Sequence, residues 1–249
     1  MEIPVPREMH ASTLISLAIC AIVIAGLVLA LQNQRRRVRT IRKKFNELEG
    51  EEHRMFTFLH DLGLAIENEP SPSVLSRIIV DGIDKVVTAR GGAIYFANSE
   101  NDFLNPSYIS EECPPLIGIP VEIRKKAERD PRALESHVRL SRVAVTDGIL
   151  GHCLSAGEPI HVRDVKNHPA FRDAFTRYTD DVSALLAPLR HANKDLGVLV
   201  VARRHQDGSF TANDFAVFRT AAEQSSFAIG NARIHREAHE KRAMESELQ

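Results

Sequence analysis

The sequence has few cysteines and lacks the spacings that form disulfide or zinc sites. Only three of its 249 residues are cysteine, and Cys113 and Cys153 lie far apart with no CxxC pair. This usage favours a reducing compartment and argues against a disulfide framework or a zinc centre. GxSxG, P-loop and HExxH motifs are absent as well. We therefore expect a protein that is not an enzyme and has no catalytic residues, no bound metal and no cofactor.

The chain also lacks an excess of either charge, but its net charge of −1 is a sum of unlike parts. Seven basic residues and no acidic residue lie between positions 35 and 44, whereas residues 45–249 carry 24 Lys and Arg against 31 Asp and Glu. An acidic body argues against a nucleic-acid-binding surface. With 43% hydrophobic and 26% charged residues, neither a disordered chain nor a many-pass membrane protein fits.

One long apolar run precedes the basic cluster. Ala11–Leu31 is 21 residues long and carries no charge, so as a helix it reaches about 30 Å, the thickness of one hydrocarbon core. A cleaved signal peptide is the alternative, but the run is long and no cleavage site with a suitable mature start follows it. We expect a single-pass anchor in the inner or plasma membrane. Positive residues stay on the cytoplasmic side, so residues 1–10 should face outward and the rest inward, and the basic cluster can also contact anionic lipid headgroups.

Residues 35–55 predict a basic juxtamembrane segment and a coiled-coil neck. Apolar positions recur every three or four residues, with Glu52 the single polar member; they are Val38, Ile41, Phe45, Leu48, Met55, Leu59, Leu62 and Ile66. Such a heptad seam predicts a parallel homodimer. The alternative is one amphipathic helix packed on the domain that follows it.

The rest of the chain predicts an α+β domain built around an antiparallel sheet. We expect a helix from Ser73 to about Arg90, a hairpin of strands at 93–97 and 103–110, and helical segments over 119–137 interrupted at Pro131. Further strands are expected at 182–190 and 196–204, joined by a loop at 191–195. A long helix should begin near Asn213.

Several short segments, taken in order, resemble a GAF domain. They are Asp147-Gly148-Ile149-Leu150-Gly151, Gly157-Glu158-Pro159, Asp164-Val165, His168-Pro169-Ala170-Phe171, Ser183 to Leu189, Leu196-Gly197-Val198-Leu199-Val200, Phe210 to Asp214 and Ala228 to Arg233. The resemblance covers residues 56–235. It implies a six-stranded antiparallel sheet flanked by helices, with a small-molecule pocket under the loops and short helices, in a module that senses ligands or serves for dimerisation.

A narrower resemblance concerns residues 134–140 and the helix that ends the sequence. Together they look like the sensor region of bacterial serine phosphatases of the sporulation protein E type, in which such a helix leads into a metal-dependent phosphatase. Residues 236–249 would then start a linker or coiled-coil signalling helix, with the phosphatase domain absent from this sequence. The resemblance implies a downstream phosphatase or another output domain as a partner.

The GAF resemblance also implies a set of ligand-binding candidates for an unidentified small molecule. They are Tyr95, Val145, His152, Asp164, Phe171, Phe175, Leu185 and Ala187. His152, His161, His168 and Cys153 offer metal or haem ligation as an alternative, although their spacing matches no metal motif. The Asn-Lys pair of cyclic-nucleotide-binding GAF domains is replaced by Arg203-Arg204, so Phe210 and Asp214 are interpreted as a packing and capping pair at a helix start. Two functions stay open: a membrane-anchored ligand sensor that acts through its C-terminal helix, and a dimerisation scaffold without a ligand.

Overall fold

The computed structural model describes residues 52–68, 71–171 and 181–247, together with the single residues 32, 34 and 50. The predicted membrane span at 11–31 and most of the predicted neck lie outside these residues. Within the described part of the chain, no helix is long and apolar enough to cross a membrane. Residues from Arg54 onward form one compact unit.

Six antiparallel strands form one sheet. They are β1 (Gly91–Ala97), β2 (Phe103–Ile109), β3 (Val143–Ala144), β4 (Ile160–Val162), β5 (Val182–His191) and β6 (Lys194–Arg204), in the spatial order β3-β2-β1-β6-β5-β4. The predicted antiparallel α+β arrangement is confirmed. The β5–β6 connection is shorter than expected, because Ala192 and Asn193 both adopt positive φ angles, of 47° and 63°, and His191 already pairs with Lys194. Such a two-residue turn matches the twist of a hairpin.

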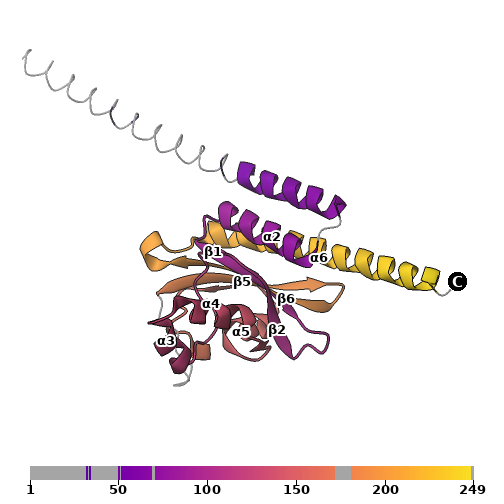
Figure 1. Cartoon of the computed structure of the whole chain (residues 1–249). Coiled ribbons are helices and arrows are strands. Elements are labelled where there is room, and N and C mark those ends of the chain that lie inside the picture. The colour runs from indigo at the N-terminus through magenta and orange to yellow at the C-terminus, as the bar shows by residue number, and fades with distance from the viewer. Residues whose placement is uncertain are drawn as a thin grey trace, which may run out of the picture. The chain divides into compact units, whose positions relative to one another are not determined.

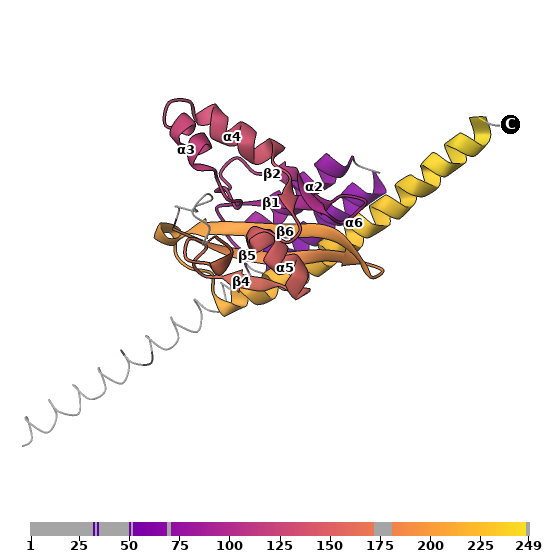
Figure 2. The ribbon, with the colours of Figure 1, turned by 90° about the horizontal axis from the view of Figure 1, so that it is seen from below.

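Helices cover both faces of the sheet (Figures 1 and 2). On one face lie α2 (Pro72–Val86) and α6 (Ala212–Glu247), and on the other α3 (Val121–Ala127), α4 (Pro131–Leu140) and α5 (Gly148–Ala156). Two 3₁₀ turns, η1 (Pro169–Phe171) and η2 (His205–Asp207), complete the elements. Each face has its own hydrophobic cluster, so alternate residues of the central strands are buried on opposite sides.

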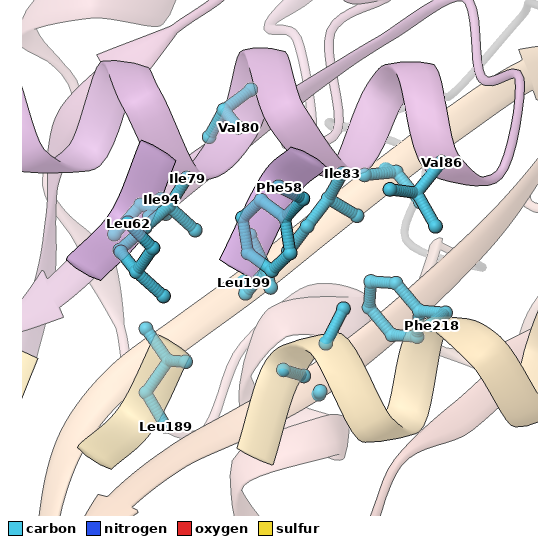
Figure 3. Close-up of a cluster of buried hydrophobic side chains, with 14 of the residues drawn as sticks. Phe58, Leu62, Ile79, Val80, Ile83, Val86, Ile94, Leu189, Leu199 and Phe218 are labelled. Carbon is cyan, nitrogen blue, oxygen red and sulfur yellow. The ribbon is translucent and has the colours of Figure 1, made fainter. Parts of the chain in front are cut away.

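The helix over residues 52–67 contributes to the core on the α2 and α6 face. Its Phe58 and Leu62 side chains are buried (Figure 3). A Cβ on Gly82 of α2 would lie too close to the Phe58 ring, so a side chain there would collide with it. Leu59, in the predicted seam, stays 39% exposed. The part of the 52–67 helix with Phe58 and Leu62 therefore packs on the domain that follows it. The coiled-coil seam upstream of this helix stays a prediction.

The cap of α2 lies two residues earlier in the chain than expected. Ser71, and not Ser73, caps the helix, because its hydroxyl accepts a hydrogen bond from the Val74 amide at 3.4 Å. Pro72 takes the first helical position, where its missing N–H costs nothing.

Arg203, at the end of β6, connects the sheet to the end of α2. It is 8% exposed, and its Nη2 donates to the carbonyl oxygens of Val87 at 2.6 Å and Thr88 at 3.0 Å. Thr88 has a positive φ of 50°. Nη1 of the same guanidinium donates to the Ser209 carbonyl at 3.2 Å. Arg203 thus fixes two turns outside the sheet by hydrogen bonds, the one after α2 at Val87 and Thr88 and the one before α6 at Ser209.

The start of α6 has the predicted packing and capping pair. The Asp214 carboxylate accepts from the Thr211 amide at 2.8 Å, and the Thr211 hydroxyl accepts from the Asp214 amide at 3.0 Å. These reciprocal bonds form a capping box. The Phe210 ring is buried 4.3 Å from the Arg203 guanidinium. Arg203 therefore makes a structural contact at this position, whereas the neighbouring Arg204 is exposed.

Candidate functional site

The α4 helix forms one side of the candidate site. It begins after Asp130, whose carboxylate accepts from the Arg132 amide at 3.1 Å, and Pro131 occupies the first turn. It ends where the Ser141 hydroxyl donates to the His137 carbonyl at 2.6 Å. Val138 is its one buried residue, so α4 rests on the sheet through a narrow apolar contact.

The turn from β3 into α5 depends on glycine at two positions. Gly148 has a φ of 64°, a conformation that residues with a side chain rarely adopt. Gly151 lies against the preceding turn, and a Cβ there would stand 2.6 Å from the Val145 carbonyl oxygen. The Asp-Gly-Ile-Leu-Gly motif is thus explained by the backbone geometry that brings the first turn of α5 up to β3.

A cavity of about 480 Å³ lies between α4, the loop before α3, β3 and the start of α5. This volume is within the range of small-molecule sites. Its apolar wall includes buried Leu116, Ile117 and Leu150. The other lining residues are Gly118, Pro120, His137, Ser141, Arg142, Val143, Ala144, Thr146, Asp147, Gly148 and Ala170. The cavity is therefore formed by segments that lie far apart in the sequence, from Leu116 to Ala170.

The polar groups of the cavity differ in charge. Burial lowers the pKa of His137, so its imidazole is neutral at pH 7, and its Nε2 lies 3.3 Å from the Ser141 hydroxyl. Arg142 and Asp147 are exposed at the cavity wall. The Asp147 carboxylate accepts from the Thr146 hydroxyl at 3.3 Å and does not cap α5. The cavity thus offers one cation, one anion and a neutral imidazole and hydroxyl pair to a ligand.

Of the sequence-predicted residues that the structure describes, none is among the residues that line this cavity. Tyr95 is fully buried on β1, and Val145 is half-buried in the same cluster on the α5 face. Asp164 closes a turn by accepting from the Asn167 amide at 3.2 Å and its side-chain amide at 2.7 Å. These hydrogen bonds hold the pKa of Asp164 below its usual value. Its carboxylate is therefore used by the turn.

The remaining predicted residues are dispersed. Leu185 and Ala187 belong to the cluster on the α2 and α6 face, opposite Tyr95, so they cannot share a pocket with it. Phe171 ends η1, and Phe175 lies outside the described residues. The β5 residues that do face α5 are Ala184 and Leu186, one position away. In a strand that is buried on both faces, the sequence does not show which face each side chain is on, and an error of one residue assigns it to the wrong face.

The histidines named as an alternative metal set are not gathered at one place. The exposed His152 ring is 5.2 Å from that of His168. His161, by contrast, lies among Phe210 and Phe215 and pairs with the Ser183 hydroxyl at 3.1 Å. Among the residues that the structure describes, no group of three or more His, Cys, Asp or Glu is placed to hold a metal ion.

Sequence reasoning missed the contribution of α4 to the site. His137 and Ser141 stand at its end, and in the sequence residues 134–140 stand out only through a family resemblance. The helical periodicity of 131–140 predicts which residues are buried, but it does not predict which loop they face. The nearby Asp147-Gly148 turn was the one available signal, because it belongs to the motif that implied the fold.

Comparison with known proteins identifies relatives of this architecture. A family model described as GAF domain matches residues 69–230. No curated protein sequence matches the chain significantly. The GAF domain of a phosphoenolpyruvate-protein phosphotransferase from Coxiella burnetii is 16% identical, with a TM-score of 0.52 over 74% of this chain and 96% of that chain.

Two further solved structures are similar to the same extent. The GAF domain of an Acinetobacter phosphoenolpyruvate-protein phosphotransferase is 17% identical, with a TM-score of 0.52 over 74% of this chain and 97% of its own. A GAF domain/HD domain protein from Geobacter sulfurreducens is 14% identical, with a TM-score of 0.51 over 68% and 98%. At these identities the likeness concerns the fold alone.

Proposed function

The chain belongs to the GAF domain family, and from that premise we propose that it is a regulatory module that binds a small ligand in the cavity between α4 and α5. GAF domains are typically small-ligand-binding signalling modules. The single observation that carries the proposal is the cavity of about 480 Å³, whose wall combines an apolar surface with polar groups from several segments. The module is regulatory in this proposal and no reaction is assigned to it.

A path of direct contacts supports a relay from the cavity to the C-terminal helix. The first turn of α5 lines the cavity, and α5 packs on β5 and β6. On its other face, β5 packs against α6. A ligand that prefers one position of α5 would shift the population of states in which α6 takes a corresponding position. We assign α6 the role of output helix.

We also propose the arrangement around the module. The apolar run at 11–31 would anchor the chain in the inner or plasma membrane, with the GAF domain on the cytoplasmic side. The resemblance to sporulation protein E type sensors makes a serine phosphatase our preferred output, either fused or as a partner. A homodimer is supported by large apolar side chains that are exposed on the 52–67 helix and on α6: Phe56 at 68%, Phe227 at 59% and Ile234 at 54%.

The test of ligand binding uses a variant that fills the cavity. A fragment of residues 54–247 is screened by thermal shift against nucleotides, amino acids and small carboxylic acids. We expect at least one compound to raise the Tm, because binding to the folded state alone stabilises it by mass action. Ala144→Phe should abolish this rise, since Ala144 lines the cavity. Ala216→Phe, at an exposed position on α6, is the matched control and should keep it.

Two outcomes would count against the proposal. If no compound raises the Tm of the wild-type fragment while its mass in solution is that of a dimer, the scaffold function is favoured. If a compound binds wild type and Ala144→Phe equally, a ligand site exists elsewhere.

A further inference from the structure

Asp84 is a residue of α2 whose carboxylate lies close to the start of β1. Its Oδ1 is buried and has no hydrogen-bond partner. A Cβ on Gly92 of β1 would lie 3.0 Å from this oxygen, so the two elements are close at this point. An unpartnered buried carboxylate oxygen is unfavourable, and far more so when the group is charged.

The groups around Asp84 do not neutralise it. On α2 itself Asp81 stands one turn earlier, and its carboxylate already accepts from the Tyr108 hydroxyl of β2 at 3.0 Å. The segment after β2 adds Ser110 and the half-buried thiol of Cys113. Within the described residues Asp84 makes no ion pair. The facing elements therefore supply a second acid, a thiol and a hydroxyl, and no paired cation.

This environment changes the titration of the carboxyl group. Burial, and then the charge of Asp81, raise the pKa of Asp84 from 3.8 to about 7, while the Ser110 hydroxyl opposes the shift. The Ser110 oxygen accepts from the Gly92 amide at 2.9 Å, which leaves the hydroxyl able to act as a donor toward the carboxylate. Near neutral pH the folded protein thus contains both forms of Asp84.

The other side of α2 connects this group to α6. Ile79 and Ile83 of α2 are fully buried in one cluster with Phe218 and Ala222 of α6, and Figure 3 shows Ile83 and Phe218 in that cluster. A change in how α2 sits on β1 therefore reaches α6 through direct packing.

We propose that Asp84 is a proton-controlled contact: its neutral form holds α2 closed on β1, and its charged form loosens α2 and thereby the attachment of α6. The part concerning α6 rests on its proposed role as the output helix. The contact itself does not depend on the ligand cavity, which lies on the opposite face of the sheet. The module would thus respond to proton concentration as well as to a ligand.

The test is hydrogen exchange of the full chain, kept in a mild detergent because of its apolar segment, at pH 6 and pH 8 after correction for intrinsic exchange. In the wild type, we expect the opening equilibrium constant of residues 72–86 and 91–97 to be larger at pH 8 than at pH 6, by a factor of at most about ten. The reason is that the carboxyl group ionises near 3.8 in the unfolded chain and near 7 in the folded one. Asp84→Asn should remove this difference and exchange slowly at both pH values.

Two further variants keep the proposal testable if Asp84→Asn does not fold. Asp81→Asn should move the midpoint to lower pH, because one neighbouring negative charge is lost, and Ser110→Ala should move it to higher pH. An unchanged pH response in Asp84→Asn, or in both of these variants, overturns the contact. A response of α2 without one in 212–235 overturns the link to α6. Thermal shift by a cavity ligand, measured in Asp84→Asn, reports on the proposed ligand function separately.

Discussion

Removing the Arg203 side chain should destabilise the domain more than the loss of an ordinary surface charge. In Arg203→Met the apolar stem is roughly kept, but the carbonyl oxygens of Val87, Thr88 and Ser209 lose their donor. Asp214, whose carboxylate lies 3.8 Å from Nη1, loses its cation.

The magnitude follows from the burial of these groups. Breaking a buried charged network by removing one partner costs about 3–5 kcal/mol, and the cation–π contact with Phe210 adds about 1 kcal/mol. Nε of Arg203 is itself buried without a partner, and relieving that group offsets part of the loss. We expect a net decrease of about 3–4 kcal/mol in the free energy of unfolding, and roughly half of it for Arg203→Lys.

The assay is urea unfolding of the fragment 54–247, followed by circular dichroism, with the m-value checked for two-state behaviour. Arg204→Met is the matched control, because the neighbouring Arg204 is exposed, and it should change stability by less than about 0.5 kcal/mol. A loss below about 1 kcal/mol in Arg203→Met would refute the reasoning, as would equal losses in both variants.

Three other predictions follow from packing and from the N-terminal sequence. Gly63→Ala should stabilise the fragment by up to about 1 kcal/mol, since helical Gly63 has open space around it. Gly82→Ala should destabilise the fragment, because its methyl group would push against Phe58 and force the 52–67 helix outward. Urea unfolding of the two variants measures both effects. Leu48→Asp should weaken the dimer of a chain starting at residue 35, which light scattering detects, and an unchanged mass would contradict the seam. A reporter that needs the periplasm should be active when fused before residue 11 and inactive after residue 44; the reverse result would place the domain outside.

The sequence predicted the elements well where periodicity and turn residues agree. The β1–β2 hairpin, the helical segments interrupted at Pro131 and the capping pair of α6 were expected within a few residues. The β5–β6 loop is shorter than the expected 191–195, and Ala192 in it has a positive φ, which alanine rarely adopts. Turn geometry that contradicts residue preference is set by the pairing of the strands on either side.

The site was less accessible to sequence reasoning, for a physical reason. Val182–Leu189 is apolar at almost every position because helices cover both faces of the sheet, so no alternation separates Leu185 from Leu186. The cavity is also formed by α4 and the loop before α3, which meet β3 and α5 only in the folded chain. Local patterns contain no information on such a meeting.

The most direct measurement of the central claim is a hydrogen-exchange footprint of the compound that raises the Tm most. If the cavity is the ligand site, this compound should protect residues 131–150 in the wild-type fragment, with a smaller change in α6, and should protect neither region in Ala144→Phe. Protection confined to other segments, or protection of 131–150 that persists in Ala144→Phe, would contradict the account.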